Sequence, residues 1–181
     1  MRGLFLYSSG MEDNEALSTM ALLRRAKIEV DSASTEKEKT VITSYKQVIT
    51  ADFLLADIDL SKYDFQLIPG GPYVARIIDQ DVIIKETIKK FYDAKKLIGA
   101  ICAAPRFLGR LGILDNLEFT AFPGSEKDAP KGKYLGNQKS VTTDQIITAR
   151  SAGAVIEFVY ALITKIKDEA AAKQLLENII Y

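Results

Sequence analysis

The chain has 181 residues, 48% of them hydrophobic and 27% charged, which is ordinary for a folded protein with a full hydrophobic core. Its 24 basic and 24 acidic residues cancel to a formal net charge of zero, which argues against a broad surface for nucleic acid or an anionic membrane. One cysteine and no histidine exclude an internal disulfide, a Cys–His or Ser–His–Asp site and an imidazole metal site.

The compartment and domain organisation follow from segments that are missing. The apolar run at residues 4–7 is too short for a signal peptide, and no stretch reaches the roughly eighteen apolar residues of a membrane span. There is no internal repeat or linker. We therefore expect one domain over residues 1–181 in the cytoplasm, with no external cofactor, no metal, no nucleic acid and no membrane partner.

Short apolar runs bounded by turn residues predict buried strands, and apolar residues at helical spacing predict helices. In chain order the N-terminal part predicts a strand over 4–7, a helix over 12–27, a strand over 28–33 and a hairpin of 40–43 with 47–50. The rest predicts a strand over 65–68 ending in a Pro-Gly-Gly turn, a helix over 82–92, a strand over 97–101, a helix over 103–111, polar strands over 118–122 and 140–150, and helices over 152–166 and 168–180.

This alternation of strands and helices is typical of an α/β protein with a mainly parallel sheet and helices on both faces. Sites in such sheets form at the carboxyl ends of the strands. Three strand ends carry informative residues: Ser8–Gly10, Pro69–Gly71 and Cys102.

Small residues surround Cys102 in the segment 99–105, which is the pattern of a nucleophile elbow, a sharp turn from strand to helix. We expect a strained backbone at this cysteine, and a thiol whose pKa is lowered by the helix N-terminus. The backbone N–H groups of Ala103 and Gly71 are candidates for binding an anion held at the sulfur.

Three segments together resemble the DJ-1/PfpI superfamily: Leu67–Gly71, Gly99–Pro105, and Ile147–Gly153 with Glu157–Phe158. Glu12–Glu15 and Leu23–Ala26 fit its DJ-1 branch, whose members are often labelled ThiJ. The resemblance implies a flavodoxin-like, doubly wound sandwich, a homodimer, and Glu15 lying beside the thiol.

The effect of Glu15 on the thiol then depends on whether its carboxyl group is protonated. An ionised Glu15 raises the pKa of the Cys102 thiol by charge repulsion, whereas a protonated Glu15 donates a hydrogen bond to the thiolate or to a sulfinate oxygen. Glu15 is therefore the candidate proton carrier and sulfur ligand, and Gly70, Phe122, Arg150 and Tyr45 are the candidate pocket residues.

The chain departs from the family pattern at Phe122, where many relatives place a histidine. A cysteine hydrolase mechanism of the PfpI type is therefore not expected. Any glyoxalase or deglycase chemistry would need Glu15 or water to carry every proton transfer.

Three functions stay open. In the first, a non-catalytic redox sensor protects against stress through peroxide oxidation of Cys102, a thiol without an internal disulfide partner. In the second, a cofactor-free enzyme uses Cys102 and Glu15 on methylglyoxal, another small reactive carbonyl or a glycated adduct. A role in thiamine biosynthesis rests on the ThiJ label alone, because no phosphate loop supports it.

The first helix suggests how two copies would meet. Its apolar residues Ala16, Leu17, Met20 and Leu23 exceed what one short helix needs to dock on a sheet. The predicted hairpin over 40–50 would bring Tyr45 towards the other subunit's site, where relatives place an interface residue.

Overall fold

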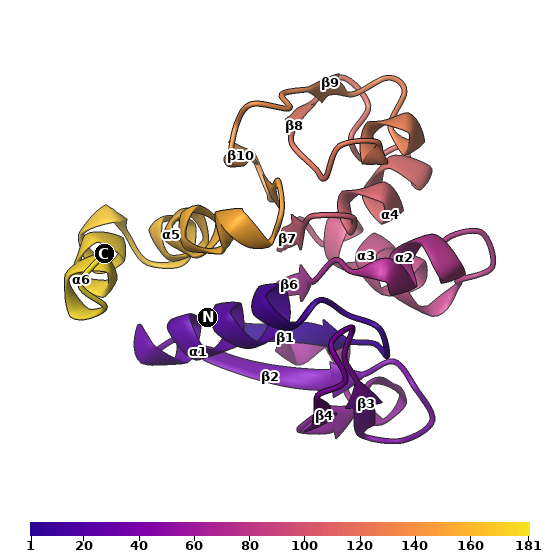
Figure 1. Ribbon diagram of the computed structural model, residues 1–181, viewed down its shortest axis with the longest axis horizontal. Helices are drawn as coiled ribbons and strands as arrows, with labels where there is room; N and C mark the ends of the chain where they lie inside the picture. Colours follow the sequence, from indigo (N-terminus) through magenta and orange to yellow (C-terminus); the bar gives the residue numbers. More distant parts are fainter.

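The computed structural model describes residues 1–181 and has a seven-stranded sheet between two layers of helices (Figure 1). The strand order is β10-β11-β7-β6-β1-β2-β5, and every neighbouring pair is parallel except β10 with β11. The strands are β1 (Arg2–Tyr7), β2 (Glu29–Ser34), β5 (Phe53–Leu54), β6 (Phe65–Ile68), β7 (Leu97–Ile101), β10 (Ser140–Thr143) and β11 (Ile146–Ala149).

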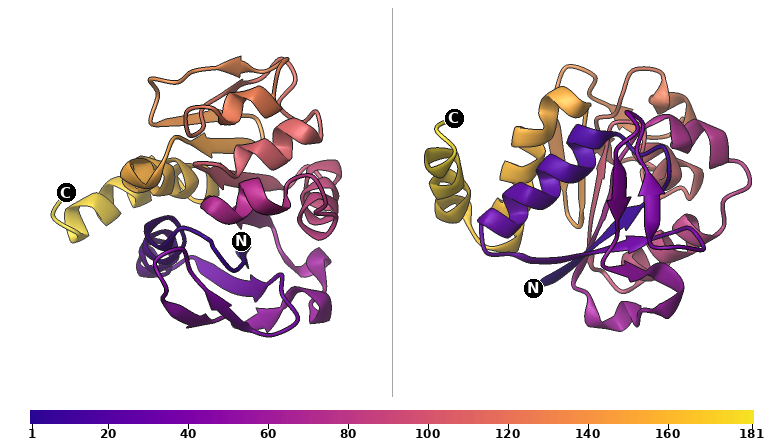
Figure 2. Two further views of the ribbon diagram at one scale, coloured as in Figure 1. Left: turned by 45° about the vertical axis from the view of Figure 1, so that its right-hand side comes forward. Right: turned by 60° about the horizontal axis from the view of Figure 1, so that its bottom comes forward.

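Helices cover both faces of this sheet, as the expected doubly wound α/β sandwich requires (Figures 1 and 2). One layer holds α1 and α5, which pack on each other, with α6 outside α5 at the end of the molecule. The other layer holds α2, α3 and α4. The helices are α1 (Thr19–Arg25), α2 (Pro72–Ile77), α3 (Ile83–Asp93), α4 (Pro105–Arg110), α5 (Val155–Ile166) and α6 (Glu169–Asn178).

Smaller elements complete the fold. A π-helix, η1 (Asn14–Ser18), leads into α1, and β3 (Thr40–Ile42) pairs with β4 (Val48–Thr50) in a separate hairpin. The remaining elements are β8 (Glu118–Phe119), β9 (Lys133–Tyr134), η2 (Leu55–Asp57), η3 (Leu60–Lys62), η4 (Ser125–Asp128) and η5 (Ala152–Ala154). None of the helices is long and apolar enough to cross a membrane.

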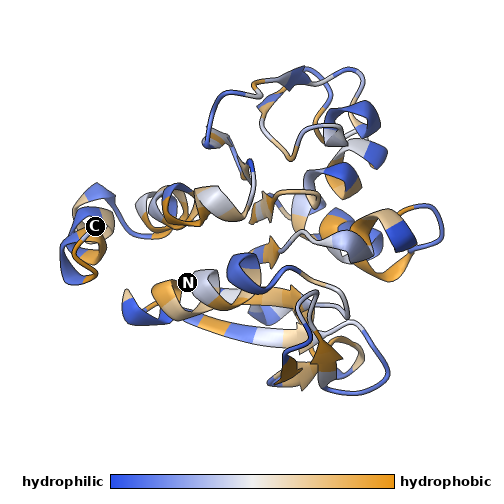
Figure 3. Ribbon diagram, viewed as in Figure 1, coloured by the Kyte–Doolittle hydropathy of each residue, from blue (hydrophilic) through white to orange (hydrophobic).

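The core lies where the central strands meet the two helical layers. Every residue of β6 and β7 is buried, which explains their nearly continuous apolar sequences (Figure 3). At Gly99 an added Cβ would lie 2.7 Å from Leu67 Cδ2 and 2.9 Å from Phe158 Cζ. The missing side chain of Gly99 therefore lets α5 pack closely on β7, and this anchors the strand that leads to Cys102.

Three local expectations differ from the structure. The predicted strand over 140–150 is an antiparallel hairpin, because Asp144, at φ 32°, turns the chain between β10 and β11. The Pro-Gly-Gly-Pro segment is more than a turn, since Pro72 begins helix α2. The strand predicted over 118–122 ends at Phe119.

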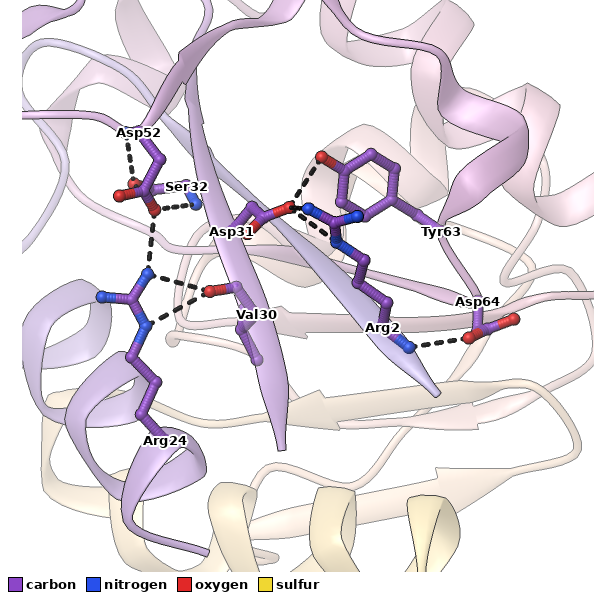
Figure 4. A network of polar contacts seen from close by, with 8 residues as sticks. All are labelled: Arg2, Arg24, Val30, Asp31, Ser32, Asp52, Tyr63 and Asp64. Carbon is purple, nitrogen blue, oxygen red and sulfur yellow. Dashed lines mark hydrogen bonds and ion pairs between the residues drawn. The ribbon is translucent and has the colours of Figure 1, made fainter. Parts of the chain in front are cut away.

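A network of polar contacts joins β1, β2 and α1 (Figure 4). Arg2 Nε donates to Asp31 Oδ2 across 2.8 Å, and the Tyr63 hydroxyl donates to the same oxygen across 2.9 Å. Arg24, in the last turn of α1, binds Asp52 across 2.8 Å. These contacts hold the end of α1 against strand β2.

Candidate active site

Cys102 is the first residue after β7 and stands three residues before α4. Its φ is 63°, in the left-handed region that residues with a side chain rarely adopt. Both of its backbone polar groups are bonded: the N–H donates to Ala149 O and the carbonyl accepts from Phe122 N, each across 2.8 Å. These bonds hold the strained residue at the strand-to-helix junction. That Cys102 acts as a nucleophile there stays a prediction.

Glu15 belongs to the π-helix η1 and has no solvent-exposed surface. Its Oε2 accepts the backbone N–H of Gly70 across 2.8 Å. A Cβ added at Gly70 would lie 2.7 Å from Cys102 Cβ and 2.8 Å from both Ala103 N and Glu15 Oε2. Gly70 is therefore the contact point at which Cys102, Ala103 and Glu15 meet, and only a glycine fits there.

The pKa of Glu15 is raised from 4.5 to about 7. Burial is the main cause, because it disfavours the charged carboxylate, and the negative charge of Glu12 raises the pKa further. Hydrogen bonds from Cys102 and from the backbone N–H groups of Gly70 and Ala152 oppose the rise. Glu15 therefore changes its protonation state near neutral pH, as an acid that both gives and takes a proton must.

The half-buried thiol of Cys102 does not have the lowered pKa that a helix N-terminus would produce. Burial raises its pKa, and the charge of Glu15 and their shared hydrogen bond raise it further, against a lowering by the Ala103 N–H. Helix α4 begins only at Pro105, three residues beyond the thiol. Above neutral pH Glu15 is therefore mostly ionised while Cys102 keeps its proton, and the charge of each group affects the pKa of the other.

Gly71 packs against the loop that precedes η1. At φ 118° it adopts a conformation that favours glycine, and an added Cβ would lie 2.5 Å from Gly10 O and 2.6 Å from Glu12 N. It lets the loop before η1 pack against the Pro-Gly-Gly turn. Its expected role as an N–H donor to an anion at Cys102 stays a prediction.

Of the other predicted pocket residues, Phe122 contacts Cys102 through the backbone, since its N–H donates to the Cys102 carbonyl, and its side chain is 50% exposed. Arg150 is half-buried, and its backbone N–H donates to Lys139 O across 2.9 Å. Tyr45 is 71% exposed in the turn between β3 and β4. No hydrogen bond or ion pair joins Arg150 or Tyr45 to Cys102 or Glu15 within one copy.

The site contains a residue that the sequence analysis did not single out. Glu12 Oε2 accepts the backbone N–H of Glu15 across 2.7 Å, in the manner of a helix cap. The signal was present, because an acceptor side chain three residues ahead of a helical N–H is the usual capping spacing. No three acidic or cysteine side chains lie together so as to hold a metal ion.

Most of the apolar face of the first helix is used within the chain, and its expected part in a dimer stays a prediction. Ala16, Met20 and Leu23 are buried within the chain itself, and only Leu17 is half-buried. Exposed apolar side chains stand instead on the hairpin of β3 and β4: Ile42, Tyr45 and Val48, which are 49%, 71% and 69% exposed.

Comparisons with known proteins point to one family. The family model of the DJ-1/PfpI family matches residues 1–165. The Parkinson disease protein 7 homolog of Danio rerio is 30% identical over 182 residues, which cover 99% of this chain and 96% of that protein. The glutathione-independent glyoxalase DJR-1.2 of Caenorhabditis elegans is 28% identical over 167 residues, covering 92% of this chain and 88% of the relative.

Another relative is longer, since the match to protein DJ-1 homolog B of Arabidopsis thaliana, 29% identical over 159 residues, covers 87% of this chain but 36% of that protein. Among solved structures, oxidized DJ-1 of Toxoplasma gondii superposes with a TM-score of 0.89 at 29% identity, covering 99% of this chain and 98% of its own. DJ-1beta of Drosophila melanogaster superposes with a TM-score of 0.92 at 23% identity, covering 99% and 98%, and supports the fold.

Proposed function

Because this chain belongs to the DJ-1/PfpI family, we propose that it is a stress-protective redox sensor that works through oxidation of Cys102. One observation carries the proposal: the fully buried carboxyl of Glu15, with a pKa of about 7, packs at Gly70 beside the half-buried Cys102 at a strand end. Such a pair responds to peroxide without a histidine, and the chain has none.

The chemistry needs no further reactant than peroxide. Proton transfer from the thiol to Glu15 gives a thiolate, whose sulfur attacks one peroxide oxygen, forming an S–O bond as the O–O bond breaks. The leaving hydroxide takes the Glu15 proton and becomes water, so the sulfur is oxidised by two electrons and the peroxide is reduced. A second peroxide converts the sulfenate to a sulfinate in the same way.

The product would be retained at the same place. The chain has no second cysteine, so a sulfenate cannot close an internal disulfide and proceeds along the oxidation ladder. Protonated Glu15 and the N–H groups of Ala103 and Gly71 are the proposed donors to the sulfinate oxygens. A Cys102 that stays a thiol until peroxide reaches it suits the reducing cytoplasm, where we place the protein.

Intact-mass spectrometry after stepwise addition of hydrogen peroxide tests this function. We expect the mass of two oxygen atoms to be gained at Cys102 before Met11 or Met20 is oxidised, and no such gain in Cys102→Ser. Oxidation confined to methionine would remove the proposal.

A second candidate function is favoured by the named glyoxalase among the relatives. Cys102 would add to the aldehyde carbon of methylglyoxal, and the Glu15 carboxylate would move the proton from that carbon to its neighbour. The aldehyde carbon is thereby oxidised while the ketone carbon is reduced, and water releases the hydroxy acid and the thiol. Turnover of methylglyoxal, lost in Cys102→Ser, would establish this enzyme; glycated adducts test the deglycase variant.

We also propose that two copies associate through the hairpin of β3 and β4. Ile42 and Val48 are opposite one another in its register, and Tyr45 lies in the connecting turn. All three are exposed, which is costly for large apolar side chains grouped on one small element. An interface centred there would bury roughly 1,200 Å² or more, the lower end for specific contacts.

A further inference from the structure

We propose that Glu12 is a positioning residue that holds the carboxyl group of Glu15 against Cys102. The inference deepens the proposed function and rests on it. It stands on a closed ring of hydrogen bonds at the start of η1, to which Glu12 contributes both its backbone and its side chain.

The ring has three members, each of which donates its backbone N–H to the next. Glu12 N donates to Gly70 O across 2.9 Å, and Gly70 N donates to Glu15 Oε2 across 2.8 Å. Glu15 N donates to Glu12 Oε2 across 2.7 Å and closes the circuit. Two of its three bonds join the first loop to the Pro-Gly-Gly turn, so the ring fixes the acid relative to the strand ends.

The surroundings leave the ring little freedom to move. Gly70 is packed directly on Cys102, and the Glu12 backbone is packed on Gly71. The Glu12 carbonyl also accepts the N–H of Ala16 across 3.1 Å, which begins the helical turn. The ring has two side-chain acceptors, Glu15 Oε2 and Glu12 Oε2. Substituting Glu12 removes one of them and leaves both the backbone and the Glu15 carboxyl in place.

Glu12 also acts through its charge. The titratable groups around Glu15 are Cys102 at the end of β7, Glu12 in its own loop, and Tyr73 of α2, whose own pKa is raised by burial and by the Glu15 charge. The charge of Glu12 raises the pKa of both Glu15 and Cys102. The hydrogen bond and the charge are separable, because glutamine retains an acceptor oxygen and lacks the charge.

The experiment compares Glu12→Gln and Glu12→Ala with the wild type. The first readout is the pH profile of Cys102 alkylation by iodoacetamide, which rises as the pair loses its first proton and then levels off. The second is the yield of sulfinate at a fixed dose of hydrogen peroxide. Glu36→Gln and Glu36→Ala are matched controls, because Glu36 Oε1 accepts the N–H of Ser9 across 3.0 Å in the same way, away from the ring.

For Glu12→Gln we expect the alkylation midpoint to move to lower pH by about half a unit, since a nearby negative charge is lost. Its sulfinate yield should stay within about twofold of wild type. Glu12→Ala should lower the plateau rate and the sulfinate yield about tenfold, the usual effect of losing a hydrogen bond to a charged or reactive group. Both Glu36 variants should match the wild type.

The inference would be overturned if Glu12→Gln and Glu12→Ala lost plateau rate and sulfinate yield equally. It would also be overturned if Glu12→Ala behaved as the wild type. If Glu12→Ala does not fold, Glu12→Met, which keeps the side-chain length without an acceptor oxygen, replaces it, and wild-type behaviour of that variant overturns the inference. A wild-type protein whose Cys102 takes up no oxygen would defeat the proposed function, whereas the alkylation profile, which uses no peroxide, would still decide the role of Glu12.

Discussion

Gly70 stands level with Cys102 on the neighbouring strand end, close enough that a Cβ on Gly70 would lie 2.7 Å from Cys102 Cβ. The register explains this: β6 and β7 pair Ile68 with Ala100, so two residues further along the chains are opposite one another. Sheet pairing thus aligns Gly70 with Cys102, and the backbone N–H of Gly70 in turn holds the Glu15 carboxyl at the same place.

The first prediction follows from that contact. Gly70→Ala should lower the free energy of unfolding by about 2 kcal/mol or more, because backbone and side-chain atoms surround the added methyl group. It should also slow Cys102 alkylation, since Glu15 is displaced. Gly153→Ala is the control, because the nearest atom to its added Cβ is 3.8 Å away. Urea unfolding of both variants checks this, and equal stability would contradict it.

A second prediction concerns pH. The Glu15 pKa of about 7 lies above its ordinary 4.5, so the folded state binds this proton more tightly than the unfolded state. The resulting stability is complete below pH 4.5 and is lost as pH rises through 7. Compared with Glu15→Gln, the wild type should lose on the order of 3 kcal/mol across that window.

Urea unfolding at pH 4, 6 and 8 measures that difference. Glu36→Gln, which removes a carboxylate from the surface, should keep the wild-type decline. Parallel curves for the wild type and Glu15→Gln would show that Glu15 is not buried as an acid.

The third prediction concerns Asp128 of η4, which accepts from both Arg106 and Arg110 of α4. Burial alone would raise its pKa, but the hydrogen bonds and charges of the two arginines outweigh burial and lower it. The stability it contributes is therefore present at neutral pH and is lost as pH falls through the lowered pKa.

Asp128→Asn should cost about 2 kcal/mol at pH 7, because two cations lose their shared partner. Asp93→Asn should cost less than about 0.5 kcal/mol, since the Lys89–Asp93 pair has side chains that are 65% and 58% exposed. Thermal unfolding of the two variants compares them; similar losses would refute the ranking.

The fourth prediction tests the association surface. Val48→Glu should convert a dimer to a monomer of 20.0 kDa in sedimentation at micromolar concentration, because a charge would enter an apolar interface. Ile180→Glu is the matched control, since Ile180 is 96% exposed at the other end of the molecule. A wild type that sediments as a monomer would remove both the dimer and any role of Tyr45 across it.

The central part of the fold was predictable from sequence because its signals are local. β1, β6 and β7 are short apolar runs, and α3 has the apolar spacing of a helix packed on a sheet. Helix α2 was missed because it has only six residues behind a Pro-Gly-Gly turn, too few to show a period. The turn at Asp144 was missed because it contains no glycine or proline.

The closeness of Glu15 to Cys102 was predictable, but the pKa shifts of the two groups were not. The proximity of Glu15 to Cys102 came from resemblance to a family, since they lie 87 positions apart and no local pattern connects them. The raised pKa of both groups depends on burial by segments distant in sequence, which spacing does not reveal. The thiol was accordingly expected to be more acidic than its surroundings permit.

The two borders of the sheet offer little backbone to which another strand could be added. β5, at one border, offers only the two residues Phe53 and Leu54, and β10, at the other, is four residues long and runs against the direction of its neighbours beside β8. Neither strand presents a long row of unpaired backbone N–H and C=O groups with which a further strand could pair. A second copy that approaches either border would therefore meet mainly side chains and little free strand backbone.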